Sequence, residues 1–310
     1  MTELSNPIFH NDDAARAHLE AIRWPDGRIC PHCGNADQDK IRTLAGKSTR
    51  SGLYQCNECR EHFTVTVGSV MERSHIKLHK WVLGFHLMAA SKKGMSAHQL
   101  HRMLGITYKS AWFMAHRIRE AMGETNPSPM GGEGSKVQAD ETYYGNTSKR
   151  AKGYKKGHSQ KASVVALVDP ATGQARAFHV ERATSESVRE ILVTNVHRTS
   201  ELHTDESNLY IRVGKEFAAH KTVEHGSSGS GFYVGKDGQT TNNVENFFGT
   251  FKRGMKGTYH FCGRQHLQRY LTEFEFRYNH RSGLGVNDGE RAALAIQGAE
   301  GKRLTYRPAH

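Results

Sequence analysis

The sequence predicts an α+β chain of several domains: a small metal-binding module, a helical region, and a larger α/β domain with a mixed sheet. Three observations predict this order. Two Cys-x-x-Cys pairs lie near the N-terminus, helical periodicity dominates residues 77–118, and strand-like segments with one intervening helix fill residues 136–205. At 310 residues, the chain has room for one domain of ordinary size and one or two small ones.

The formal net charge of +12 indicates a polyanionic partner, although charge alone does not separate DNA from RNA or a membrane surface. No apolar run is long enough to span a membrane. The first residues carry acids where a secretory signal needs basic and then apolar residues. We therefore expect a soluble, cytoplasmic protein that has no membrane partner.

Four of the five cysteines form two pairs separated by 22 residues. Two such knuckles can surround one zinc ion with four thiolates, which makes a closed, structural site. A redox dithiol is the alternative, and His32 is interpreted as a bystander. Strands predicted over residues 54–56 and 62–67 flank the second knuckle and complete a zinc ribbon. The expected zinc ligands are Cys30, Cys33, Cys56 and Cys59.

Residues 96–118 have the outline of a helix-turn-helix. Ser96 can cap the first helix, and Gly105 supplies the turn. The small core would consist of Ala97, Leu100, Leu104, Ile106, Ala111 and Ile118. An ordinary helical hairpin with exposed basic residues is the alternative. In a DNA-binding arrangement, the residues that could reach DNA are Tyr108, Lys109 and Arg117.

The larger domain begins with three strands, which the turn chemistry around residues 169–173 predicts to be an antiparallel meander. A helix and a fourth strand follow, and this is the element order of a ribonuclease-H-like fold. In that fold the first and fourth strands lie side by side. The predicted domains are an N-terminal helix (1–24), the zinc ribbon (25–72), a helical region (73–123), a linker (124–135), the ribonuclease-H-like domain (136–283) and a tail (284–310).

Three acids occupy settings that suit a divalent-metal site. Asp140 and Asp205 lie in the first and fourth predicted strands, and Glu245 lies on the polar side of an amphipathic helix over residues 240–254. A solvated charge is the alternative for a single helical carboxylate. Since neighbouring side chains of a strand point to opposite faces, Asp140 and Glu141 are not expected to serve one site together. Carboxylates that hold hard cations suit phosphoryl transfer.

A basic run follows the first strand of this domain. It contains no acid, so it would repel itself unless it were solvated or neutralised by phosphates. A solvated loop is the alternative to a DNA contact. The residues are Lys149, Arg150, Lys152, Lys155, Lys156 and Lys161.

These features together resemble bacterial insertion-sequence transposases of the DDE type, which place a zinc ribbon before a ribonuclease-H-like catalytic domain. The resemblance extends from Cys30 to about Arg281. It is carried by the segments ADETYYG, HTD, NNVENFFGTFK with GTYH soon after, and HLQRYLTEFEFRYNHR.

The resemblance implies that Asp140, Asp205 and Glu245 are the acidic triad. Members of the group carry either Asn or Glu at the third position, so Asn242 competes with Glu245, although charge favours Glu245. Lys252 would touch DNA near the cleaved bond, and Arg253 is a further candidate contact.

The resemblance also implies the reaction. The protein would bind the terminal inverted repeats of an insertion sequence and catalyse Mg²⁺-dependent 3′-end cleavage and strand transfer. One structural zinc ion and a pair of Mg²⁺ ions, replaceable by Mn²⁺, are expected. The partners would be double-stranded element-end and target DNA and at least one further copy of the chain, on the bacterial nucleoid. Two alternatives are a non-catalytic, sequence-specific DNA-binding regulator and a structure-specific nuclease on the same fold.

Overall fold

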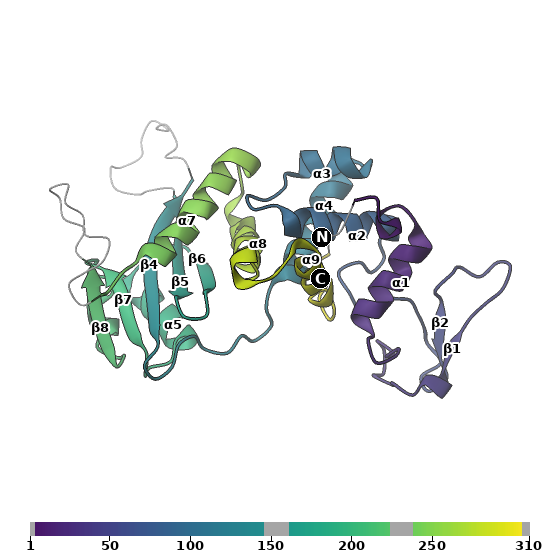
Figure 1. Cartoon of the computed structure of the whole chain (residues 1–310), viewed down its shortest axis with the longest axis horizontal. Helices are drawn as coiled ribbons and strands as arrows, with labels where there is room; N and C mark the ends of the chain where they lie inside the picture. The colour runs from purple at the N-terminus through teal and green to yellow at the C-terminus, as the bar shows by residue number, and fades with distance from the viewer. Residues whose placement is uncertain (1–3, 146–160, 224–237, 306–310) are drawn as a thin grey trace. The chain divides into compact units, whose positions relative to one another are not determined.

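The computed structural model describes residues 4–145, 161–223 and 238–305 (Figure 1). The chain divides into two compact units. The first combines residues 1–124 with residues 280–310, and the second comprises residues 125–279. Among the described residues, no helix has the length and apolar character needed to cross a membrane.

The N-terminal part of the first unit is a three-stranded antiparallel sheet beside one helix. The strands β1 (Ile41–Thr43), β2 (Tyr54–Cys56) and β3 (His62–Phe63) pair in this order. The helix α1 (Asp12–Arg23) is capped by the Asn11 side chain. β3 ends four residues earlier than predicted because turns begin after Phe63, and β1 was not predicted.

Helices α2 (Leu78–Ala90), α3 (Ala97–Leu104) and α4 (Tyr108–Met122) follow the ribbon. The predicted turn between α3 and α4 is present: Ser96 forms a capping box with Gln99, and Gly105 adopts φ 57°, a left-handed conformation that glycine tolerates. The predicted core is buried at Leu100, Leu104, Ala111 and Ile118, whereas Ala97 and Ile106 are only partly buried.

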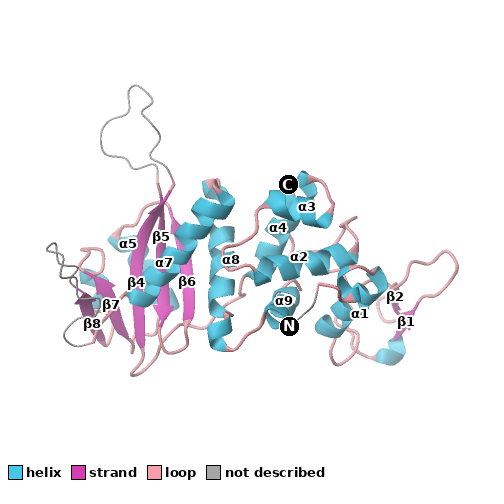
Figure 2. Cartoon of the chain, turned by 45° about the horizontal axis from the view of Figure 1, so that its top comes forward, coloured by secondary structure: helices cyan, strands magenta, loops and turns pink. Residues whose placement is uncertain are grey.

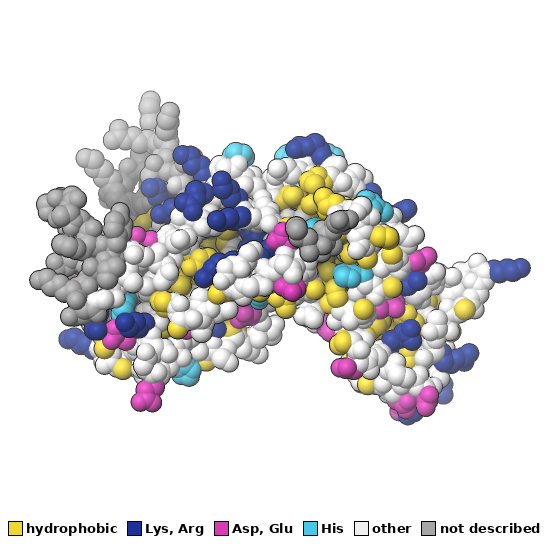
Figure 3. Space-filling view, viewed as in Figure 1, with side chains coloured by type: hydrophobic (Ala, Val, Ile, Leu, Met, Phe, Trp, Pro, Cys, Tyr) yellow, Lys and Arg dark blue, Asp and Glu magenta, His cyan; other side chains and the backbone are white. Residues whose placement is uncertain are grey.

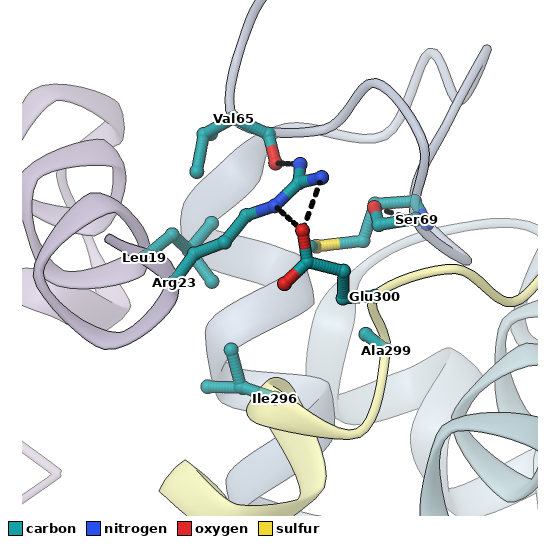
Figure 4. A pocket seen from close by; sticks show the side chains of 8 residues that line it. Leu19, Arg23, Val65, Ser69, Ile296, Ala299 and Glu300 are labelled. Atoms are coloured by element: carbon teal, nitrogen blue, oxygen red, sulfur yellow. Dashed lines mark hydrogen bonds and ion pairs between the residues drawn. The ribbon is translucent and has the colours of Figure 1, made fainter. Parts of the chain in front are cut away.

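The last helix, α9 (Asp288–Gln297), packs against α2 and α1 and thereby returns the chain to the first unit. Figure 4 shows how the segment after α9 is fixed. Arg23 donates to the carbonyls of Val65 and Val67 and pairs with Glu300 at 3.2 Å. This guanidinium therefore ties α1 and the end of the ribbon to the segment after α9.

The second unit contains a five-stranded mixed sheet in the order β6-β5-β4-β7-β8 (Figure 2). β4 pairs antiparallel with β5, as β5 does with β6, whereas β4–β7 and β7–β8 are parallel. This topology confirms the predicted ribonuclease-H-like fold. The strands are β4 (Lys136–Tyr144), β5 (Ala162–Asp169), β6 (Gln174–Val180), β7 (Glu201–Asp205) and β8 (Ala219–Val223).

Both faces of this sheet are covered, which explains why every residue of β5 is buried. α7 (Asn242–Gly254) and α8 (Leu267–Asn279) cover one face (Figure 1). α5 (Ser185–Asn195) and the short α6 (Ile211–Gly214) pack on the other. The side chains of α7 predicted to pack inward are buried: Val244, Phe247, Phe248, Phe251 and Met255.

Amide side chains attach α8 to the sheet edge. Gln268 accepts from the amide of His179 and donates to the carbonyl of Ala177, and Asn279 makes the same pair of bonds with Ala175. The segment predicted as a linker, 124–135, is also ordered against this unit, because Met130 is buried and bridges to Val196.

Candidate active site and zinc cluster

The four paired cysteines converge as the spacing predicts. One ligand atom from each of Cys30, Cys33, Cys56 and Cys59 lies within 4.8 Å of the others. The Cys30–Cys59 and Cys33–Cys56 sulfur distances are both 3.7 Å. Tetrahedral zinc with Zn–S bonds of about 2.3 Å places neighbouring sulfurs about 3.8 Å apart, so the residues fit this ion.

The backbone around the second knuckle favours thiolate formation. Hydrogen bonds from the amides of Cys59 and Glu58 help to lower the pKa of the Cys56 thiol to about 6. Asn35 also donates its side-chain amide to the Cys56 sulfur. These donors favour the thiolate of Cys56 alone, because burial and the neighbouring cysteines raise the pKa of Cys33, and raise that of Cys59 to about 12.

The sheet register brings Asp140 and Asp205 together. Gln138 on β4 pairs with His203 on β7, and this is the last pair of that parallel ladder. Each aspartate lies two residues beyond its paired residue, so both stand on the same face. Their carboxylates lie within 4.8 Å of each other, although the two residues are 65 positions apart in the sequence.

Glu141 also lies in this cluster, although strand alternation predicted that it would not share a site with Asp140. A carboxylate oxygen of Glu141 lies within 4.8 Å of those of both aspartates. Alternation still holds along β4, because Glu141 remains paired with Val165 of β5. β4 is no longer paired with β7 at this point, and the longer Glu141 side chain reaches the carboxylates of both aspartates. Tyr210, which is buried, holds it there by donating its hydroxyl to Glu141 Oε2 at 2.8 Å.

The carboxylates oppose one another's ionisation. Burial, followed by the charge of Asp205, raises the pKa of Asp140 to about 7. The charges of Glu141 and Glu245 act in the same direction, and burial also raises the pKa of Glu141. A set of hard oxygen donors that resists full ionisation fits a divalent cation, whose charge would remove the repulsion.

Glu245 approaches from α7 and lies outside the group of three carboxylates within 4.8 Å, yet close enough for its charge to act on Asp140. Thr241, at the start of the helix, donates its hydroxyl to Glu245 Oε1 at 2.7 Å. This bond fixes the orientation of the Glu245 carboxylate. Asn242, the competing candidate, is exposed one helical turn earlier.

Two strand residues hold the start of α7, and sequence reasoning did not identify either role. Gln138, fully buried, accepts from the amides of Asn243 at 3.0 Å and Val244 at 3.3 Å. It thus caps a helix whose N-cap residue Thr241 supplies no side-chain cap. His203 is buried in β7 and also accepts from the amide of Thr240.

The predicted DNA contacts fall into three groups. Lys252 and Arg253 are exposed in the last turn of α7, and Figure 3 shows Lys and Arg side chains gathered over this helix. Tyr108 and Lys109 are exposed at the start of α4, whereas Arg117 is partly buried and donates to the carbonyl of Glu72. Of the predicted basic run, Lys161 is described, and Lys149, Arg150, Lys152, Lys155 and Lys156 lie outside the described residues.

Comparisons with known proteins agree with this architecture. Residues 131–279 match the ISXO2-like transposase domain, and residues 10–62 match the transposase zinc-ribbon domain. A protein of Halobacterium salinarum, described as an uncharacterized protein in transposable element ISH50, is 25% identical over 282 residues, covering 87% of this chain and 91% of that protein.

Solved structures show only remote similarity. The simian T-cell lymphotropic virus intasome in complex with the PP2A regulatory subunit B56 gamma aligns with a TM-score of 0.30 and 17% identity, over 57% of this chain and 63% of that chain. The HTLV-2 integrase catalytic core domain in complex with magnesium gives 0.27 and 12%, over 46% and 86%. Such low TM-scores carry no argument about function. The two domain matches show that the chain belongs to the ISXO2-like (IS1595) DDE transposases with an N-terminal zinc ribbon.

Proposed function

We propose that this transposase binds the terminal inverted repeats of its insertion sequence and catalyses Mg²⁺-dependent 3′-end cleavage followed by strand transfer. The observation that carries the proposal is the convergence of Asp140 and Asp205 on one face of the sheet, with Glu245 approaching from α7. An acidic cluster at this place in a DDE transposase domain suits a reaction on phosphodiesters.

In the proposed mechanism, Asp140, Asp205 and Glu245 hold a pair of Mg²⁺ ions, for which Mn²⁺ can substitute. Bound there, divalent cations supply activation of the attacking oxygen and stabilisation of the leaving one. Lys252 lies two turns after Glu245 on the same helix and would neutralise a phosphate beside the scissile bond. No side chain needs to form a covalent bond with DNA.

The first unit would recognise DNA. Tyr108 and Lys109 lie exposed at the start of the second helix of the predicted helix-turn-helix, where base edges are met in such motifs. One structural zinc ion would maintain the ribbon. We assign recognition to residues 25–123 and chemistry to residues 136–283, with at least two copies of the chain acting on paired ends at the nucleoid.

The test is replacement of the carboxylate that the sheet register places beside Asp140. Asp205→Asn should reduce Mg²⁺-dependent cleavage of DNA from the flanks of the coding region by at least about 10³-fold, because a neutral amide is a weaker ligand. Binding to the same DNA should be retained. Glu206→Gln, at the adjacent exposed residue, is the matched control and should cleave normally.

Unchanged cleavage by Asp205→Asn would overturn the proposed chemistry. Tight binding by the wild-type protein without any Mg²⁺- or Mn²⁺-dependent nicking would instead indicate a DNA-binding regulator.

A further inference from the structure

The loop between α7 and α8 exposes an aromatic side chain that the proposed mechanism does not use. Phe261 is 81% exposed, the largest value among the exposed large hydrophobic residues of the described chain. Its neighbour Cys262 is buried, and Tyr259 is partly buried against the hydrophobic core of this unit. The loop therefore turns one aromatic ring outward between residues that face inward.

The backbone at this place is strained. The amide of Phe261 donates to the carbonyl of Tyr259, two residues earlier, at 2.6 Å, and His260 between them adopts φ 60° and ψ −47°. This is a γ-turn with positive φ, a rare conformation for a residue with a side chain. A π-helical turn, Met255–Tyr259, precedes it. Both features are costly and often accompany functional sites.

Buried polar contacts hold the strained turn in place. Tyr259 donates its hydroxyl to Glu273 at 2.5 Å, and Glu273, fully buried on α8, also pairs with Arg277. The Tyr259 ring packs edge-on against Tyr270, with ring centroids 4.8 Å apart. The GTYH segment singled out in the sequence thus anchors the base of the turn, and Phe261 follows it.

The charge around Phe261 identifies the kind of partner. Between Glu245 and Glu273, residues 246–272 contain no acid and five basic residues: Lys252, Arg253, Lys256, Arg264 and Arg269. The first four are exposed. An exposed aromatic ring among cations suits a polyanion that also offers flat apolar surfaces, and DNA has both properties. A second protein copy with the same basic surface would be repelled.

We propose that Phe261 is an aromatic wedge that stacks on a base step of the DNA duplex bound along α7. The helix rises about 1.5 Å per residue, so the turn lies at least roughly 15 Å from Glu245. At about 3.4 Å per base pair, the contacted step is at least about four base pairs from the scissile phosphate. The inference rests on the proposed function, because α7 must lie along DNA for the ring to reach a base.

The test compares a paired duplex of about 30 base pairs with the same duplex carrying one T·T mismatch, by fluorescence anisotropy. A wedge enters a weakened step at lower cost, so wild-type protein should prefer the mismatched duplex. Phe261→Ala should lose this preference and bind the mismatched duplex about tenfold more weakly. Phe261→Trp should keep the preference. Because Phe261 is exposed, its truncation should leave the melting temperature unchanged.

Ile211→Ala is the matched control: Ile211 is 52% exposed on α6 of the same unit, and its removal should leave both affinities unchanged. Retention of the mismatch preference by Phe261→Ala would overturn the inference. Altered sedimentation of DNA-free Phe261→Ala, together with normal DNA binding, would also overturn the inference. This result would identify Phe261 as a contact between two copies of the chain. Wild-type cleavage of flanking DNA is measured in parallel, and its absence would overturn the proposed function instead.

Discussion

The two candidate metal-binding clusters of this chain are assembled in different ways. The four cysteines lie between Cys30 and Cys59 and meet through local hairpins, whereas Asp140 and Asp205 come from distant segments and meet through the register of the sheet. Glu245 approaches them from α7. The first cluster can be identified from spacing alone, but the second requires the topology. In both clusters burial and neighbouring groups oppose full ionisation: the pKa of Cys59 is raised to about 12, and that of Asp140 to about 7.

Removing one cysteine of the four-cysteine cluster should have the largest effect. Cys56→Ser should lose zinc, unfold the ribbon and weaken DNA binding at least about 100-fold, because structural zinc contributes on the order of 10 kcal/mol to folding. Zinc content and circular dichroism are the measurements. Cys262→Ser is the control, since the fifth cysteine lies outside the cluster and should leave zinc bound. Full zinc occupancy in Cys56→Ser would contradict the assignment.

The carboxylate site is tested at Glu245, the proposed third ligand. Glu245→Gln should lower single-turnover cleavage by about 10²–10³-fold, because it removes a charged ligand that Thr241 orients. Asn242→Ala should lower it less than about tenfold. The reverse ranking would make Asn242 the ligand and Glu245 a solvated charge.

The burial of Asp140 and its repulsion by the neighbouring carboxylates predict a pH dependence of stability. The pKa of Asp140 is about 7 in the folded protein against 3.8 as its ordinary value, so the protonated form favours folding. This contribution is complete below about pH 4 and is lost as pH rises through about 7, a change on the order of 2–4 kcal/mol. The melting temperature of the metal-free protein should therefore fall between about pH 5 and 8.

Mg²⁺ should raise the melting temperature more at about pH 8 than at about pH 5.5, since binding requires the ionised carboxylate. Asp140→Asn should remove most of the pH dependence in differential scanning fluorimetry. A melting temperature that rises across this range in the metal-free wild type would contradict the repulsion.

The smallest expected effect is that of replacing Gln138. It distinguishes a residue that positions the active site from one that only stabilises the fold. Gln138→Met removes the cap of α7, and Gln268→Met removes equivalent bonds between α8 and β6. Each should cost about 1 kcal/mol of unfolding free energy. Gln138→Met alone should also reduce kcat about tenfold and weaken the Mn²⁺-induced shift in melting temperature, because it displaces Glu245. If the two variants behave alike, Gln138 contributes to stability and does not position Glu245.

The predictable part of the fold is the part with a strong local pattern. β4, β5 and β7 begin and end where alternation and apolar runs predict, and α7 buries the predicted side of the helix. β8 was missed because Ala219–Val223 is short and largely polar. α9 was missed because its apolar residues are buried against α2, α1 and α4, helices that lie far away in sequence.

The candidate active site could likewise be predicted only in part. Asp140 and Asp205 could be paired because the fold implies adjacent strands. Glu141 was not expected beside the aspartates, yet its carboxylate lies within 4.8 Å of theirs, because alternation fixes the face from which a side chain starts and not how far a long side chain reaches at the end of a neighbouring strand. The role of Gln138 depends on the start of α7 lying beside β4, and no local sequence pattern encodes this position. A signal did exist: Gln138 lies two residues before Asp140, on the same face.

The return of the chain into its first unit has a consequence for the element that encodes it. α9 closes the apolar surface of α2 only after the whole catalytic unit has been synthesised. A gene copy broken after residue 279 would encode the proposed DNA-recognition elements without that cover, and its product should be degraded. Decayed copies would thus rarely yield a competitor that occupies the ends without cutting them.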